Sequence, residues 1–139
     1  MCGIIGINSN RPVSSTIISS LKKLEYRGYD SAGIATLSNN EINEVKSEGR
    51  VDNLENNLLV QKMEGTIGIG HVRWATHGLP NSINAHPHSS QNVSVVHNGI
   101  IENSTLLKKF LVSKGHKFKS QTDTEAVSYT HLTLPTMQV

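Results

Sequence analysis

Apolar residues in the first half of the chain recur at helical spacing in some stretches and at strand spacing in others. Between Val13 and Leu24 they fall on one helical face, which predicts an amphipathic helix. The turn-forming sequence Ser38-Asn39-Asn40 separates two short apolar runs, which predicts a β-hairpin. In chain order, the expected elements are a strand over residues 3–7, a helix over 13–25, strands over 34–37 and 42–46, a helix over 51–63 and a strand over 66–72.

The second half is less regular, because residues 73–91 follow neither period and are rich in Gly, Pro and His. Irregular stretches of this length are usually either functional or disordered. After this stretch we expect a buried strand over 93–96, a helix that begins at Asn103 or Ser104 and ends at Gly115, and a short strand over 116–119.

The last segment gives conflicting signals. Thr122-Asp123-Thr124-Glu125 has the form of a capping box and announces a helix. Residues 128–139 nevertheless keep neither helical nor strand periodicity and contain Pro135. We therefore expect one domain over residues 2–127 and a disordered or artefactual tail over 128–139. Helices and strands interleave through hairpin-like connections, which predicts an α+β fold with mixed or antiparallel sheets.

Composition narrows the classes of function. A chain of 139 residues is one domain or part of one. Its net charge of +2 is small and its Lys and Arg are spread along the sequence, so neither nucleic acid nor a membrane surface is an expected partner. We find no signal peptide and no stretch of membrane-spanning length. One cysteine cannot form an internal disulfide, which favours a reducing cytoplasm.

That single cysteine is Cys2, directly after the initiator Met1. A start Met before a small residue is normally removed, which would give Cys2 both a thiol and a free α-amine. Peptide α-amines titrate at about 7.7 to 8.0, so such an amine is a ready base beside a nucleophile. The alternative is that Cys2 is a small apolar residue at the start of a buried strand.

A second candidate segment is His71-Val72-Arg73-Trp74-Ala75-Thr76-His77-Gly78. The guanidinium of Arg73 at a strand exit has the forked geometry that binds a carboxylate. Thr76 and His77 could donate further hydrogen bonds to the same group. An ordinary surface loop explains the spacing equally well.

Histidines in the irregular stretch raise the question of a metal. His86 and His88, together with His71, His77 and Cys2, invite a zinc interpretation. His-x-His in a loop that contains Pro is a weak signature, however, and no paired cysteines support it. We therefore expect no metal and no cofactor.

Two further positions offer polar groups to a ligand. Asn98-Gly99 follows a predicted strand, and its side-chain amide and backbone N–H could form an oxyanion hole. An Asn-Gly hairpin turn is the competing interpretation and, on pattern alone, the stronger one. Asp123 at the predicted helix cap could face the ammonium group of a ligand, or serve only as part of the cap.

Taken together, these segments resemble the class II glutamine amidotransferases, whose nucleophile is the N-terminal residue. The resemblance covers about residues 2–127, with the motifs in family order. The matching segments are Cys2 to Gly6, Leu24 to Gly33, Arg73 to Gly78, Asn84 to His88, Val95 to Asn103 and Thr122 to Glu125. Their forms point to the branch that uses fructose 6-phosphate rather than to purine-pathway amidotransferases, asparagine synthetases or glutamate synthases.

The resemblance implies an N-terminal-nucleophile hydrolase fold, a four-layer αββα sandwich, and L-glutamine as substrate. It implies that Cys2 attacks the side-chain amide while its own α-amine relays protons. Asn98 and Gly99 would then stabilise the oxyanion.

For substrate binding, the resemblance assigns the glutamine α-carboxylate to Arg73, aided by Thr76 and His77, and the α-ammonium to Asp123. Trp74 would lie in the loop that closes over glutamine and routes ammonia.

The family's domain continues well past Glu125, and sugar-phosphate domains that bind fructose 6-phosphate follow it. We therefore expect this chain to be a truncated fragment of a homo-oligomeric parent, with an incomplete sandwich. An inactive remnant that at most binds glutamine is the alternative.

Overall fold

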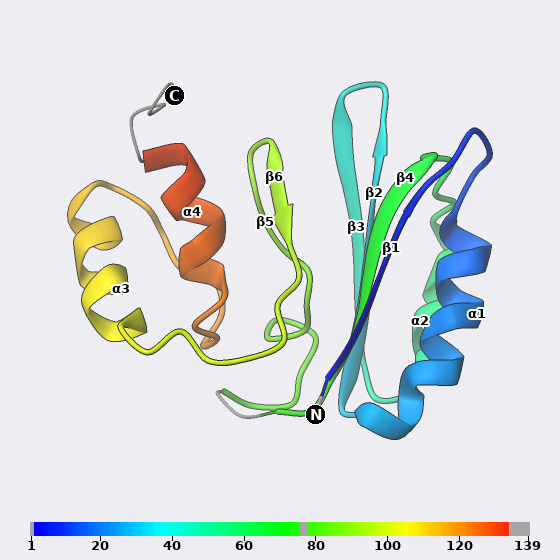
Figure 1. Ribbon diagram of the computed structural model, residues 1–139, viewed down its shortest axis with the longest axis horizontal. Coiled ribbons are helices and arrows are strands. Elements are labelled where there is room, and N and C mark those ends of the chain that lie inside the picture. Colours follow the sequence, from blue (N-terminus) through cyan, green and yellow to red (C-terminus); the bar gives the residue numbers. More distant parts are fainter. Residues whose placement is uncertain (1, 76–77, 134–139) are drawn as a thin grey trace.

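The computed structural model describes residues 2–75 and 78–133, and arranges them in four layers (Figure 1). Two helices cover one face of a four-stranded sheet, a two-stranded sheet lies beyond its other face, and two more helices close the far side. In chain order the elements are β1 (Gly3–Asn8), α1 (Ser14–Leu24), the 3₁₀ turn η1 (Glu25–Arg27), β2 (Ser31–Ser38), β3 (Glu41–Glu48), α2 (Val51–Val60), β4 (Ile67–Arg73), β5 (His88–Ser90), β6 (Val93–Val95), α3 (Ser104–Ser113) and α4 (Glu125–Thr133).

The larger sheet has the order β1-β4-β2-β3, and every neighbouring pair is antiparallel. Gly3 pairs with Val72, and Ser31 pairs with Arg73. The starts of β1 and β2 therefore lie beside the end of β4. The candidate residues Cys2 and Arg73 both lie at this end of the sheet.

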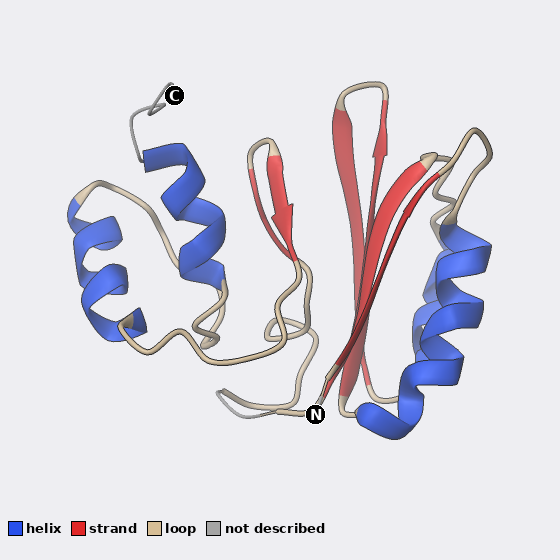
Figure 2. Ribbon diagram, in the orientation of Figure 1, coloured by secondary structure: helices blue, strands red, loops and turns tan. Residues whose placement is uncertain are grey.

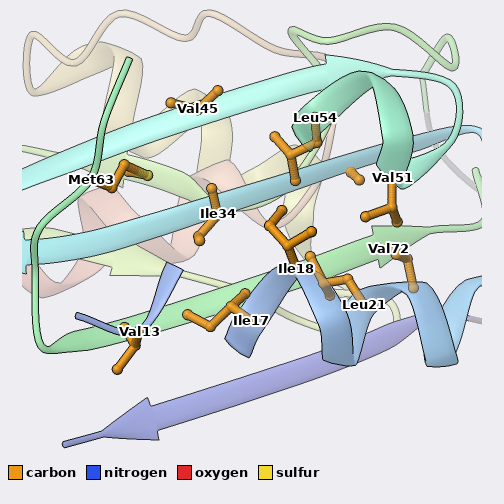
Figure 3. Packing of buried hydrophobic residues seen from close by; sticks show 11 residues of the cluster. Val13, Ile17, Ile18, Leu21, Ile34, Val45, Val51, Leu54, Met63 and Val72 are labelled. Atoms are coloured by element: carbon orange, nitrogen blue, oxygen red, sulfur yellow. The ribbon is translucent and has the colours of Figure 1, made fainter. Parts of the chain in front are cut away.

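Successive residues of β4 point to opposite faces of the sheet, as they do in any β-strand. A Cβ at Gly68 or Gly70 would lie 2.7 or 2.6 Å from Ile17, so these glycines make room for α1. Helices α1 and α2 bury their apolar faces there, in the cluster drawn in Figure 3. His71 and Arg73 point to the opposite face, toward the smaller sheet.

The second half contains a smaller apolar core. Strands β5 and β6 form an antiparallel hairpin that α4 covers, with α3 outside it (Figure 2). Its buried apolar cluster consists of Leu111, Ala126 and Tyr129. Most other buried side chains of this half are polar.

The predicted elements of residues 3–72 are confirmed, with shifted ends: β2 begins at Ser31, inside the predicted polar loop. The helix after Asn103 is confirmed, and Gly115 follows it with a φ of +94°. Residues 116–119 form no strand, and β5 was missed within the stretch predicted to be irregular.

The end of the described chain corrects two expectations. Helix α4 starts at Glu125 rather than after Thr122, and the Glu125 carboxylate accepts hydrogen bonds from the backbone of Lys119 and Ser120 instead of closing a capping box. The expectation that no helix forms after residue 127 is wrong for residues 128–133. Tertiary contacts stabilise this helix: Ser90 donates to the Ser128 carbonyl at 2.8 Å. Residues 134–139 lie outside the described residues.

Candidate active site

A cavity of about 400 Å³ lies between the first half of the molecule (β1 to β4 with α1 and α2) and the second half (β5, β6, α3 and α4). We call this boundary the seam. The ends of β1 and β4 form one wall, and the segments after β6 and before α4 form the other. Six predicted site residues from distant parts of the sequence line it. The cavity is lined by Cys2, Arg27, Arg73, Trp74, His86, His97, Asn98, Gly99, Ile100, Thr122, Asp123 and Thr124.

The thiol of Cys2 is half-buried at the start of β1. The Trp74 backbone N–H donates to Cys2 Sγ at 3.2 Å, and the thiol lies 3.6 Å from the Trp74 carbonyl. The Arg27 Nε–H donates to the Cys2 carbonyl at 2.8 Å. Hydrogen bonds thus hold Cys2 at both its sulfur and its carbonyl oxygen, and the residue lines the cavity.

Asn98 reaches the same residue from the second half. Its Nδ2 group donates to the Cys2 carbonyl at 3.2 Å, and its Oδ1 lies 3.0 Å from His71 Nε2. Gly99 has a φ of +147°, a conformation that favours glycine. No strand follows it, so the hairpin interpretation of Asn98-Gly99 is wrong, and both residues line the cavity with Cys2.

Arg73 and Asp123 supply opposite charges to the cavity. The Arg73 side chain is buried and donates to the Leu79 carbonyl at 2.9 Å. Burial lowers the pKa of Arg73, and the carboxylates of Asp30 and Asp123 oppose that shift. One oxygen of Asp123 accepts the Ile101 N–H, which fixes the carboxylate at the cavity wall.

The remaining predicted residues have different outcomes. Trp74 lines the cavity with about half of its surface exposed, 52%. Thr76 and His77 lie outside the described residues.

His71, His86 and His88 form a buried row with ring centroids 4.1 and 4.7 Å apart, and of the three only His86 is among the residues that line the cavity. Burial lowers the pKa of His71 to about 4 and that of His88 to about 3, and it lowers the pKa of His86 as well. Across residues 2–75 and 78–133, no group of three or more His, Cys, Asp or Glu side chains is arranged to hold a metal ion.

Arg27 is the lining residue that sequence reasoning missed most clearly. The available signal was the dense polar segment Tyr26 to Gly33. Within it, a Cβ at Gly28 would lie 2.5 Å from the Arg73 carbonyl carbon, so only glycine allows this turn to pack against the Arg73–Trp74 peptide. Similarly, a Cβ at Gly33 would overlap the His86 carbonyl. Gly28 thus lets its turn approach the end of β4, and Gly33 lets β2 approach the segment that carries His86.

The family comparison agrees with this geometry. Residues 55–134 match the family described as "Glutamine amidotransferase domain". The chain therefore belongs to the glutamine amidotransferase domain family.

The particular relatives are more specific. The chain is 55% identical over 129 residues to glutamine–fructose-6-phosphate aminotransferase (isomerizing) of Mesorhizobium japonicum, and this match covers 93% of the chain. It is 56% identical to the protein of the same name from Clostridium acetobutylicum, over 91% of the chain. The chain spans 21% of the length of each of these relatives.

Solved structures share the fold. Glutamine phosphoribosylpyrophosphate amidotransferase from B. subtilis superimposes with a TM-score of 0.77 at 29% identity, over 93% of this chain and 28% of that one. A structure of the allosteric regulatory enzyme of purine biosynthesis superimposes with a TM-score of 0.76 at 30% identity, over 93% of this chain and 29% of that one. The predicted α+β, N-terminal-nucleophile type of fold is therefore confirmed. No helix within the described ranges is long and apolar enough to cross a membrane.

Proposed function

We propose that the cavity at the seam hydrolyses the side-chain amide of L-glutamine, with the Cys2 thiol as nucleophile. The observation that carries the proposal is convergence: a thiol, an amide donor, a guanidinium and a carboxylate from four separate segments line one cavity. A cavity of about 400 Å³ suits a small polar ligand.

Charge explains why a free amino acid would fit. Glutamine is a zwitterion, so its α-carboxylate suits the buried Arg73 and its α-ammonium suits Asp123. Binding both charges would extend the side-chain amide toward Cys2. In this proposal Thr76 and His77 assist Arg73, and Trp74 covers the bound amino acid.

The chemistry then follows in two steps. The Cys2 sulfur adds to the amide carbon, and the resulting oxyanion is stabilised by the Asn98 side-chain amide and the Gly99 N–H. Collapse breaks the C–N bond, releases ammonia after proton transfer to nitrogen, and leaves a γ-glutamyl thioester. Water hydrolyses the thioester to glutamate. The proton acceptor is the Cys2 α-amine, which requires removal of Met1.

The similarity to glutamine–fructose-6-phosphate aminotransferases extends the proposal to a larger protein. In it, ammonia from this domain would be transferred to fructose 6-phosphate bound by other domains, in a cytoplasmic homo-oligomer. We propose that residues 2–127 belong to the amidotransferase domain. Helix α4 continues to Thr133 and the family match reaches residue 134, so a tail foreign to the domain would begin only after residue 134. An inactive remnant that binds glutamine is the competing proposal.

Glutamate release from glutamine tests the proposal directly. Cys2→Ala should abolish release while leaving the affinity for glutamine measurable by calorimetry. Intact mass spectrometry of the active protein should show that Met1 is removed. Unchanged release by Cys2→Ala would overturn the nucleophile, and glutamine binding without release by a Met1-processed chain would favour the remnant.

A further inference from the structure

The side chain of His71 is fully buried on β4, directly behind Asn98. Its Nε2 atom lies 3.0 Å from Asn98 Oδ1 and 3.3 Å from the carbonyl oxygen of His97. The carbonyl oxygen can only accept a hydrogen bond. His71 Nε2 must therefore carry the proton and share it between the two oxygens.

The amide of Asn98 is matched at both ends. Its oxygen accepts from His71, and its nitrogen donates to the Cys2 carbonyl at 3.2 Å. A rotated amide would set its NH₂ group against the N–H of His71 and its oxygen against the carbonyl oxygen of Cys2. Both contacts would be repulsive, so the histidine tautomer determines which end of Asn98 faces the cavity.

The surroundings of His71 keep it in that tautomer. Its other ring nitrogen, Nδ1, is buried and has no hydrogen-bond partner in the described part of the chain. The ring stacks on His86 with centroids 4.1 Å apart. Burial lowers the pKa of His71 to about 4, so the ring is neutral near pH 7.

We propose that His71 is a positioning residue that holds the donor end of the Asn98 amide toward Cys2 and the cavity. This inference rests on the proposed function, because the second hydrogen of the Asn98 NH₂ group matters only when an oxyanion forms there. If the amide were free to rotate, its oxygen would repel that oxyanion.

A matched set of variants separates positioning from packing. His71→Phe fills the space without donating a hydrogen bond, and should lower kcat for glutamate release by about tenfold or more, with KM for glutamine little changed. The upper limit is the roughly 10²- to 10³-fold cost of losing an oxyanion donor. His71→Gln, which keeps an N–H donor, should recover part of the loss. Ile69→Ala is the control, because Ile69 lies two residues before His71 on the same face of β4 and is not among the residues that line the cavity; its kcat should stay near that of the parent.

A double-substitution cycle then tests the route of the effect. In a chain that already carries Asn98→Ala, His71→Phe should cause no further loss of kcat, because the group it positions is gone. Independent, multiplicative losses would overturn the inference. So would an unchanged kcat in His71→Phe while Cys2→Ala is inactive, and that result would leave the proposed function standing.

A third measurement does not depend on activity. The ¹⁵N chemical shifts of the His71 ring in the unsubstituted chain should report a proton on Nε2 and none on Nδ1 near pH 7. The opposite tautomer would overturn the inference whether or not His71→Phe folds. If Cys2→Ala retains full activity, the proposed function fails instead, independently of the tautomer.

Discussion

Different interactions stabilise the interior of each half of the molecule. Among the residues whose burial is described (2–75 and 78–130), eleven buried apolar side chains pack α1 and α2 against the β1–β4 sheet, whereas three form the apolar cluster of the second half. The second half instead buries polar side chains that bond to one another and to the backbone. Asn84, for example, donates to the Leu79 carbonyl at 2.9 Å and accepts from the Gln121 N–H at 2.7 Å.

This difference assigns a role to each half. Apolar burial is non-directional and supplies stability, while hydrogen bonds fix distances and angles. The first half thus provides a firm base for Cys2 and Arg73. The second half sets the positions of Asn98 and Asp123 through specific bonds, and the cavity forms where the two meet.

The largest effect should follow from removing apolar volume in the first half. Leu21 is fully buried between α1 and the sheet. Leu21→Ala should lower the free energy of unfolding by about 2–5 kcal/mol, as large-to-small changes in cores do. Urea unfolding monitored by circular dichroism measures it, and Leu59→Ala, at a position 77% exposed, should cost no more than about 0.5 kcal/mol. Equal costs at the two positions would contradict the apolar account of this half.

A smaller effect is expected from one carboxylate in the second half. Glu125 is buried and accepts hydrogen bonds from Lys119 N at 2.9 Å and Ser120 N at 2.6 Å. Glu125→Gln should cost about 1.5–3 kcal/mol, because bonds to a charged group are stronger than those to an amide oxygen. Glu102→Gln, an exposed carboxylate of the same half, is the control. A neutral result at Glu125 would show that packing, not hydrogen bonding, holds this half.

The effect that is smallest over a single pH unit concerns the histidine row at the seam. An unfolded His titrates at about 6.5, whereas burial lowers the pKa of His88 to about 3. The unfolded chain therefore binds more protons between these values, and stability should fall as pH drops from 6.5 toward 3. His88 changes the free energy of unfolding by at most about 1.4 kcal/mol per pH unit. His88→Asn should reduce the slope of unfolding free energy against pH; an identical slope would contradict a neutral, buried His88.

How much of the molecule the sequence predicts also differs between the halves. The face from Val13 to Leu24 and the Ser38–Asn40 turn follow from period and turn chemistry, and their elements are present. Helix α4 did not follow, because its stability comes from tertiary bonds such as the one from Ser90 to the Ser128 carbonyl. The local pattern of apolar and polar residues does not reveal hydrogen bonds to residues that are distant in the sequence.

The site shows the same division. Cys2, Asn98 and Asp123 could be proposed because unusual residues stood at element ends, and the structure brings them to one cavity. Arg27 and the orienting bond from His71 could not be found, because both depend on which segments meet across the sheet. The residue type indicates which chemistry a side chain can perform, whereas the fold topology determines which other residues it contacts.

The covalent intermediate tests the central claim most directly. The protein is mixed with glutamine, quenched in acid within the first turnover, digested and analysed by mass spectrometry. The account predicts one γ-glutamyl group on the sulfur of an N-terminal Cys2, and none in Cys2→Ala. Glutamate formed with Cys2 unmodified throughout, or a γ-glutamyl group on another residue, would contradict it.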